Sequence, residues 1–255
     1  MRNFLSEDDI EVALLEALMA LSPQWERLNA YTYEPGDLKD NTHRSDKAQV
    51  VLHRTLQQAL RTLNPELPSE AIEQAATELS QGRRTMTLIN ANREVYRLIR
   101  EGVPVEYTDA EGKKQQDFAQ VIDYRQPERN HYTAVQQLWI KGEIGYRRPD
   151  VILYINGLPV VLIELKNSNV SVKQAYTDNL ATYKQELPQL FWYNALTILS
   201  NARETRAGAF TATWEHFGEW LREAEADDPD RKKIARNRLS LSYTVQALLQ
   251  PRRLL

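Results

Sequence analysis

The segment at residues 147–169, RRPDVILYINGLPVVLIELKNSN, decides the fold that we predict for this chain. It places an aspartate before an apolar run, then an Asn-Gly pair, a second apolar run, and finally the triplet Glu-Leu-Lys. An Asn-Gly pair between two runs rich in β-branched residues is a strong signal of a β-hairpin. Because apolar residues occupy both faces of each strand, we expect the hairpin to lie inside a sheet that is covered on both sides.

The composition of the 255-residue chain limits its class. A hydrophobic content of 42% supports a substantial core, so we expect a globular protein. The absence of cysteine excludes thiolate metal sites and cysteine nucleophiles, and it fits a cytoplasmic location. No apolar run is long enough to cross a bilayer, so we expect no membrane partner.

The formal net charge of −3 means that nucleic-acid binding would depend on local basic patches. The candidate patches are Arg147/Arg148, Arg203/Arg206 and the run Arg231–Arg238.

The spacing of apolar residues predicts a mostly helical first third and a β-rich middle. Ser6, followed by three acids, is an N-cap that begins a helix ending before Pro23. The patterns predict further helices at 43–63, 69–79, 92–100, 172–187, 214–221 and 234–249, and strands at 103–107, 118–124, 133–140, 151–155, 158–165 and 195–200. The helix at 172–187 suits a crossover between parallel neighbouring strands.

The position of Asp150 relative to Glu164 depends on the register of the hairpin. Residues two apart in a strand share a face, so Glu164 and Lys166 point the same way. With a strict two-residue turn, Asp150 falls opposite Ile163 and points to the wrong face. A bulge, or a three-residue loop with Gly157 in the left-handed conformation, shifts the register by one and places Asp150 beside Glu164. The functional interpretation therefore predicts such a bulge or loop.

Two carboxylates and a lysine at the end of buried strands need compensation, because desolvation penalises all three and the acids repel each other. A divalent cation would relieve the repulsion between Asp150 and Glu164, and hard oxygen ligands favour Mg²⁺ or Mn²⁺. Such an ion activates a water for attack on a phosphodiester, and Lys166 is placed to orient that water or stabilise negative charge. Arg147 and Arg148 are placed to hold neighbouring phosphates. The simpler interpretation is an ion pair at a strand end, since Glu-x-Lys is a common sequence.

The same residues resemble a known nuclease family. Pro-Asp at 149–150, with Glu-Leu-Lys at 164–166 on a hairpin, resembles the PD-(D/E)xK nuclease fold. The longer stretch RRPDVILYINGLPVVLIELK is similar to the N-terminal nuclease domain of the restriction (motor) subunit of type I restriction-modification enzymes. LSEDDIEVALLEAL, LNPELP, REVYRLIREGVPVEY and NARETRAGAF resemble further segments of that family, so the resemblance covers residues 1–210.

The resemblance implies a restriction-endonuclease-like α/β core, with a mixed central sheet flanked by helices and with helical N- and C-terminal additions. The endonuclease domain would span 1–210, helical in 1–100 and with its catalytic sheet in 101–210, and a helical segment would occupy 211–255. The implied activity is Mg²⁺-dependent cleavage of double-stranded DNA. Asp150 and Glu164 match the metal-binding acids, and Lys166 matches the catalytic lysine.

Three more residues match supporting positions of related nucleases. Glu11 lies where a helix glutamate approaches the metal, although acids near helix starts are favoured in any case. Asn179 and Tyr183 match a Gln-x-x-x-Tyr motif that supports the site or contacts DNA, with asparagine in place of glutamine. They lie one turn apart on the helix that follows the lysine strand.

The resemblance also implies partners. The full-length family subunit continues into two helicase-like domains that bind ATP, so we expect ATP to act only through a motor that is absent here. The implied partners are double-stranded DNA and the methylation and specificity subunits of a type I complex. The alternative is a catalytically silent DNA-binding or assembly module on the same fold, in which Asp150, Glu164 and Lys166 form only an ion-pair cluster. The intact set of three favours the enzyme.

Overall fold

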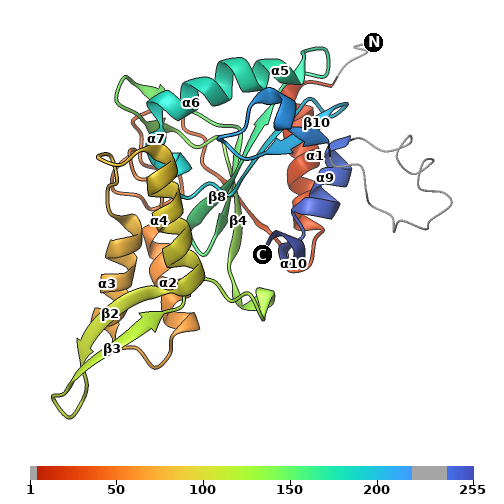
Figure 1. The fold of residues 1–255 in the computed structure, drawn as a ribbon. Coiled ribbons are helices and arrows are strands. Elements are labelled where there is room, and N and C mark those ends of the chain that lie inside the picture. The colour runs from red at the N-terminus through yellow and green to blue at the C-terminus, as the bar shows by residue number, and fades with distance from the viewer. Residues whose placement is uncertain (1–4, 220–239) are drawn as a thin grey trace.

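A seven-stranded mixed sheet forms the centre of the computed structural model, which describes residues 5–219 and 240–255 (Figure 1). The sheet order is β1-β4-β7-β8-β9-β10-β11. Its strands are β1 (Glu26–Asn29), β4 (Tyr132–Gln136), β7 (Val151–Ile155), β8 (Leu158–Leu165), β9 (Leu196–Ser200), β10 (Thr205–Gly208) and β11 (Gly218–Glu219). β1 is parallel to β4 and β8 is parallel to β9, whereas the other neighbours are antiparallel. The expected α/β architecture is confirmed.

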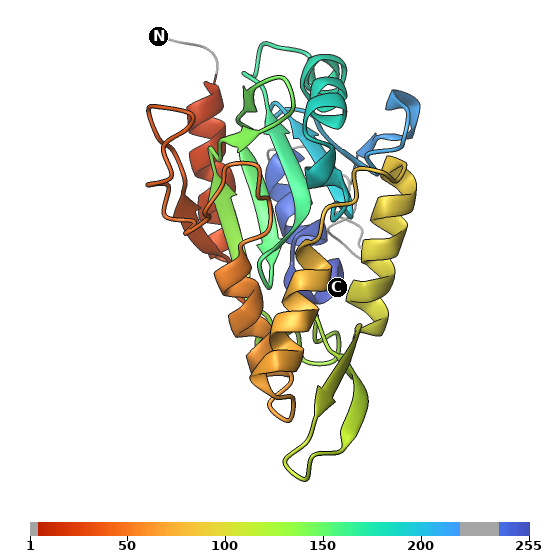
Figure 2. The same ribbon diagram turned by 90° about the vertical axis from the view of Figure 1, so that its left-hand side faces the viewer.

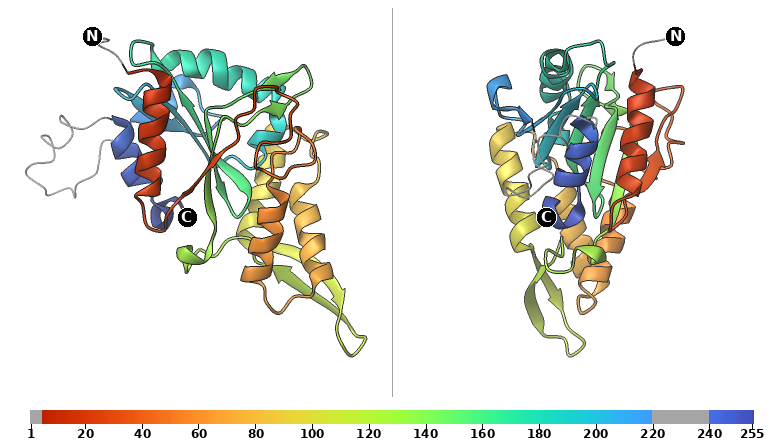
Figure 3. Two further views of the ribbon diagram at one scale, coloured as in Figure 1. Left: turned by 180° about the vertical axis from the view of Figure 1, so that it is seen from behind. Right: turned by 90° about the vertical axis from the view of Figure 1, so that its right-hand side faces the viewer.

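Helices cover both faces of this sheet. α1 (Glu7–Met19) and α9 (Ser240–Leu248) contact each other on one side, and α4 (Leu88–Glu101) lies on the other side (Figures 1 and 3). Ser6 caps α1 as expected, because its hydroxyl accepts a hydrogen bond from the Asp9 N–H. The remaining helices are α2 (His53–Leu63), α3 (Ser69–Ser80), α5 (Val172–Gln174), α6 (Ala181–Glu186), α7 (Pro188–Phe191) and α10 (Pro251–Leu254). Across the described ranges, no helix is long and apolar enough to span a bilayer.

The connection from β8 to β9 is the crossover that the sequence predicts. α5 and α6 form one continuous helical segment, joined by a π-helical turn, η2 (Ala175–Leu180). This segment links two strands that pair in parallel, Val161 with Leu196 through Leu165 with Ser200. Both hairpin strands, β7 and β8, are buried along their whole length, so the prediction of a sheet covered on both sides is confirmed.

The predicted helix at 43–63 is wrong in its first half, because α2 begins only at His53. The preceding residues are held by buried charges. Arg44 and Lys47 both contact the fully buried Asp40, at 2.7 and 2.8 Å, and the φ of His43 is +57°. A positive φ is incompatible with a right-handed helix, so turns around this ion cluster replace the expected helical residues.

Other element predictions need smaller corrections. The predicted hairpin forms as a separate two-stranded sheet of β2 (Val103–Thr108) and β3 (Lys114–Ala119) that extends away from the central sheet (Figure 2). Its second strand was wrongly predicted at 118–124, because β3 pairs with β2 directly after the turn and ends at Ala119. The strand predicted at 133–140 ends at Gln136. The predicted helix at 214–221 is instead a 3₁₀ turn, η3 (Trp214–His216), followed by β11. Residues 220–239, including the basic run Arg231–Arg238 and the start of the helix predicted at 234–249, lie outside the described residues. From Ser240 onward, α9 confirms that helix.

The β7–β8 hairpin contains the predicted bulge. The turn itself has two residues, because Ile155 pairs with Leu158, and Asn156 and Gly157 both have positive φ, +52° and +82°. The register then shifts, since Tyr154 pairs with Pro159 but Leu153 pairs with Val161, which leaves Val160 as the extra residue. Val151 consequently lies opposite Ile163, and continuing that register places Asp150 opposite Glu164. A third short ladder joins β5 (Ile140–Lys141) to β6 (Tyr146–Arg147) just before Asp150.

Candidate active site

Asp150, Glu164 and Lys166 come together where β7 begins and β8 ends. The Leu165 N–H donates a hydrogen bond to Asp150 Oδ2 at 2.7 Å, which fixes the carboxyl of Asp150 against the end of β8. Lys166 Nζ lies 3.3 Å from Glu164 Oε1 and donates to the Leu165 carbonyl at 3.0 Å. The shift of register at Val160 is what brings the first acid to the same end of the sheet as the other two residues.

The two oxygens of Glu164 have different surroundings. Three donors converge on Oε1: Lys166 Nζ, the amide of Asn179, and the Tyr183 hydroxyl at 3.4 Å. Oε2 is buried and has no hydrogen-bond partner. A buried carboxylate oxygen without a partner is costly, because its lost hydration is not replaced. Asn179 and Tyr183, which match the family's Gln-x-x-x-Tyr motif, thus lie at the site and contact the same oxygen.

Burial raises the pKa values of both acids. Desolvation is the largest cause for Asp150, whose pKa rises to about 6 although the Leu165 N–H and the Lys166 charge oppose the rise. Desolvation also raises the pKa of Glu164, to about 8, and the neighbouring charge of Asp150 adds to it. The Lys166 ammonium counteracts this rise but does not cancel it. Lys166 alone therefore does not supply enough positive charge for the two adjacent carboxylates to ionise together at neutral pH.

The donor set fits a hard divalent cation that keeps most of its water. Asp150 and Glu164 supply two carboxylates, and Mg²⁺ commonly binds through one or two carboxylates plus water and phosphate oxygens. The unpartnered Glu164 Oε2 is a ready ligand atom. Among residues 5–219 and 240–255, no group of three or more His, Cys, Asp or Glu side chains is arranged to hold a metal. The site thus offers a metal ion two protein carboxylates, those of Asp150 and Glu164.

Glu11 approaches the site from α1 but has partners of its own. Gln136 Nε2 donates to Glu11 Oε1 at 3.0 Å, and the amide of Gln137 donates to Oε2. Its pKa is raised, mainly by burial, and its charge contributes to the raised pKa of Asp150. Gln137 also donates its backbone N–H to the Asp150 carbonyl at 2.8 Å. Glu11 therefore belongs to the surroundings of the site, and direct metal binding by Glu11 stays a prediction.

The adjacent arginines diverge. Arg147 forms an ion pair with Glu186 at the end of α6, with Nε 2.7 Å from the carboxylate. Arg148 instead lies between two aromatic rings, with its guanidinium carbon 5.2 Å from the centre of Tyr31 and 4.9 Å from that of Trp139. Its charge lowers the pKa of Glu11, which places it near that acid. The charge of Arg147 is thus already paired with a carboxylate, whereas the guanidinium of Arg148 packs over two aromatic rings.

Several residues at the site were missed by the sequence analysis. Gln136 and Gln137 hold Glu11, and Tyr31 and Trp139 hold Arg148. Only the glutamines left a signal in the sequence, since Gln136 ends and Gln137 follows the strand that pairs with β7, at the end of the sheet where Asp150 lies. In the predicted basic patch Arg203/Arg206, the guanidinium of Arg206 pairs with Glu204 at 2.6 Å and packs over the ring of Trp214.

Fold and site together define a mixed α/β protein with a carboxylate–lysine cluster at the end of its central hairpin. Residues 4–241 match the family described as type I restriction enzyme R protein N terminus. The chain belongs to this family, which confirms the resemblance found in the sequence.

Similar curated proteins are endonuclease subunits of type I restriction enzymes. The chain is 35% identical over 226 residues to the HindI endonuclease subunit of Haemophilus influenzae, a match that covers 85% of this chain and 20% of that protein. It is 27% identical over 182 residues to the SauCOLORF180P endonuclease subunit of Staphylococcus aureus, with 71% and 18% covered. It is 30% identical over 126 residues to the SsaAORF53P subunit of Staphylococcus saprophyticus, with 49% and 13% covered. The chain thus spans about a fifth or less of these relatives.

Proposed function

We propose that this chain is the Mg²⁺-dependent endonuclease module of a type I restriction enzyme, with a PD-(D/E)xK core, and that it cleaves phosphodiesters of double-stranded DNA. The observation that carries the proposal is the buried, unpartnered Glu164 Oε2 beside Asp150. The family membership and the endonuclease subunits among its relatives support the same reaction class. Mn²⁺ offers the same preference for hard oxygen ligands and is a suitable substitute.

In this proposal, each residue has a separate task. A divalent ion held by Asp150 and Glu164 would supply a water of lowered pKa and positive charge at the scissile phosphate. Asn179 and Tyr183 orient the Glu164 carboxylate through Oε1, so that Oε2 stays directed to the ligand. Lys166 releases its contact with Glu164 and donates to the attacking water or to a phosphate oxygen on which negative charge develops.

Arg148 is the proposed contact to a neighbouring phosphate. Its guanidinium packs over the rings of Tyr31 and Trp139, and a preorganised guanidinium loses little freedom when it binds a phosphate in a bidentate manner. We propose that the module works within a larger cytoplasmic complex, where methylation and specificity subunits select the DNA and an ATP-driven motor delivers it. These partners are proposed from the family alone, because the chain spans only about a fifth of the length of its relatives.

The test combines metal binding with DNA cleavage. Mn²⁺ is titrated into the chain and into Asp150→Asn, Glu164→Gln and Lys166→Ala, with binding followed by electron paramagnetic resonance. Both acid variants should lose most of the binding, whereas Lys166→Ala should bind the metal and fail to nick supercoiled or linear DNA. Glu143→Gln, at an exposed acid, is the control and should match the wild type.

Unchanged Mn²⁺ binding in Asp150→Asn would remove the basis of the proposal. Metal binding by the wild type without cleavage of any DNA would favour the second candidate, a DNA-binding or assembly module that does not cut. That candidate has one observation in its favour, because Lys166 already pairs with Glu164 and hydrogen-bonds the Leu165 carbonyl.

A further inference from the structure

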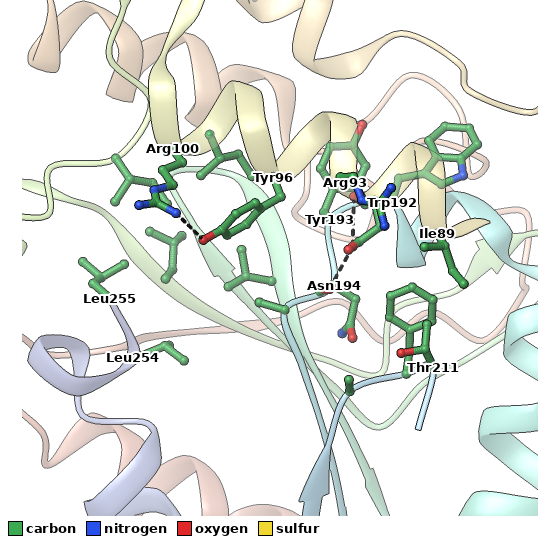
Figure 4. A pocket seen from close by; sticks show the side chains of 18 of the residues that line it. Ile89, Arg93, Tyr96, Arg100, Trp192, Tyr193, Asn194, Thr211, Leu254 and Leu255 are labelled. Atoms are coloured by element: carbon green, nitrogen blue, oxygen red, sulfur yellow. Dashed lines mark hydrogen bonds between the residues drawn. The ribbon is translucent and has the colours of Figure 1, made fainter. Parts of the chain in front are cut away.

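A large cavity lies at the other end of β8 from the acids. It has a volume of about 890 Å³ and is enclosed by α4, the start of β8, the segment before β9, and α10 (Figure 4). Val160 lines it, four residues before Glu164, so the two sites are separated by roughly 13 Å along the strand at about 3.3 Å per residue. The volume lies within the range of roughly 300–1,000 Å³ that is usual for small-molecule sites.

One stripe of α4 gives the cavity a positive wall. Arg93, Tyr96 and Arg100 are spaced three and four residues apart, and so share one face of the helix. Figure 4 shows all three side chains on the α4 side of the cavity, with Leu254 and Leu255 across from them. Among the residues that the structure describes, no aspartate or glutamate lines the cavity. Within the described ranges, neither arginine pairs with a carboxylate, although other arginines of the chain do.

Exposed aromatic rings accompany these charges. Tyr96 is 54% exposed and Tyr124 is 41% exposed, so both rings are accessible from the cavity that they line. Arg100 donates a hydrogen bond to the Tyr96 hydroxyl at 3.4 Å. Tyr96, Arg100 and Tyr124 all line the cavity, so these three side chains face the same space. An aromatic face beside a guanidinium is the combination on which nucleobases stack in single-stranded nucleic-acid sites.

The rest of the cavity is apolar and preformed. Ile122, Ile155 and Val160 supply buried aliphatic surface. The wall formed by residues 191–194 is fixed to α4, because the Asn92 amide donates to the carbonyls of residues 191, 192 and 194. Tyr193 in turn donates its hydroxyl to the Leu79 carbonyl at 2.8 Å. A rigid apolar floor with two unpaired guanidiniums at one wall suits a ligand that has a flat ring and an anionic group.

We propose that this cavity binds a nucleoside phosphate, with its base against Tyr96 and Tyr124 and its phosphate between Arg93 and Arg100. The ligand has two possible sources, a free nucleotide or an unpaired nucleotide of a DNA strand, which present the same chemistry. The site is separate from the acid cluster and does not depend on metal binding there.

The experiment is isothermal titration calorimetry on the full chain in EDTA, so that no DNA is cut. The probes are thymidine 5′-monophosphate, a twelve-nucleotide oligo(dT), uncharged thymidine, and decanoate as an anion without a ring. Arg93→Ala and Arg100→Ala should each weaken binding of the phosphorylated probes by roughly tenfold, the scale of a hydrogen bond to a charged group. Tyr96→Ala should weaken it by a similar roughly tenfold factor through lost stacking.

Arg97→Ala is the matched control, because Arg97 is exposed on the same helix but does not line the cavity. It should leave the affinity unchanged, and so should Glu164→Gln, which separates this site from the proposed active site. Tighter binding of the oligonucleotide than of the mononucleotide would identify a DNA strand as the source, and the reverse order would identify a free nucleotide. Three results would overturn the proposal: no binding of either phosphorylated probe, equal binding of thymidine or decanoate, or equal weakening by Arg97→Ala. Circular dichroism melting confirms that each variant is folded.

Discussion

Replacing Glu164 with glutamine should make the protein more stable at pH 8 in the absence of metal. The pKa of this acid rises from an ordinary 4.5 to about 8 on folding, because the side chain is buried and Asp150 lies beside it. At about 1.4 kcal/mol per pKa unit, ionising Glu164 in the folded protein costs ~5 kcal/mol more than in the unfolded chain. Water entering the end of the sheet reduces this cost, so we expect a gain of about 2–4 kcal/mol for Glu164→Gln at pH 8.

The direction with pH follows from proton linkage. An acid with a raised pKa binds its proton more tightly in the folded protein, so the associated stability is present below the unfolded pKa and is lost as the pH rises through the folded one. Wild-type stability should therefore fall between about pH 4.5 and pH 8. Glu164→Gln should fall less, because Glu164 no longer titrates and only the other acids with raised pKa values, Asp150 at about 6 and Glu11, still contribute.

Urea denaturation at pH 5, 6, 7 and 8 in EDTA measures both curves, and Glu143→Gln controls for the loss of one negative charge. A wild type whose stability is flat or rises over this range would refute the reasoning. So would a Glu164→Gln variant less stable than the wild type at pH 8, since its lost hydrogen bonds would then outweigh the removed charge.

Three further outcomes are expected. Metal binding at pH 7 should release about one proton, because the dication binds a carboxyl that is mostly protonated without it; calorimetry in two buffers of different ionisation enthalpy measures the number. Asp40→Asn should destabilise the fold by about 3–5 kcal/mol in urea denaturation, because it leaves two buried cations without their counter-ion. It should also remove the free energy of unfolding that the depressed Asp40 pKa, about 2, contributes at mildly acidic pH. Gly157→Ala should cost more than Gly112→Ala in thermal melting, because both glycines have positive φ but only at Gly157 would the new Cβ meet backbone, the Leu52 carbonyl at 2.6 Å.

The hairpin could be predicted from a local signal, the Asn-Gly pair, whereas its irregular register was predicted only from the functional interpretation. The Asn-Gly pair fixes a two-residue turn, and the need to bring Asp150 beside Glu164 then requires one extra residue in the ladder. The structure places that residue at Val160. The Asn156 side chain explains why this turn is buried: its amide donates to the Val121 carbonyl and its Oδ1 accepts the His131 N–H.

What the sequence did not predict depends on contacts between distant segments. β1 was missed because Glu26–Asn29 is short, polar and largely exposed, as an edge strand can be. The turns before His53 were mistaken for helix because apolar spacing cannot reveal a buried Asp40 with two cations around it. The pairing of Arg147 with Glu186 was likewise invisible, since 39 positions separate the two residues.

The substitution of asparagine at position 179 illustrates how the local fold preserves a contact. A shorter amide would lose its reach to the carboxylate if the helix kept the geometry suited to glutamine. In this chain Asn179 lies in the π-helical turn η2, where the extra residue per turn changes the direction of the side chains. Asn179 and Tyr183 both reach Glu164 Oε1 from there. Lys166 approaches the same oxygen from the end of β8, so all three described residues that donate to this carboxylate do so at Oε1, and we propose that Oε2 is left for a ligand.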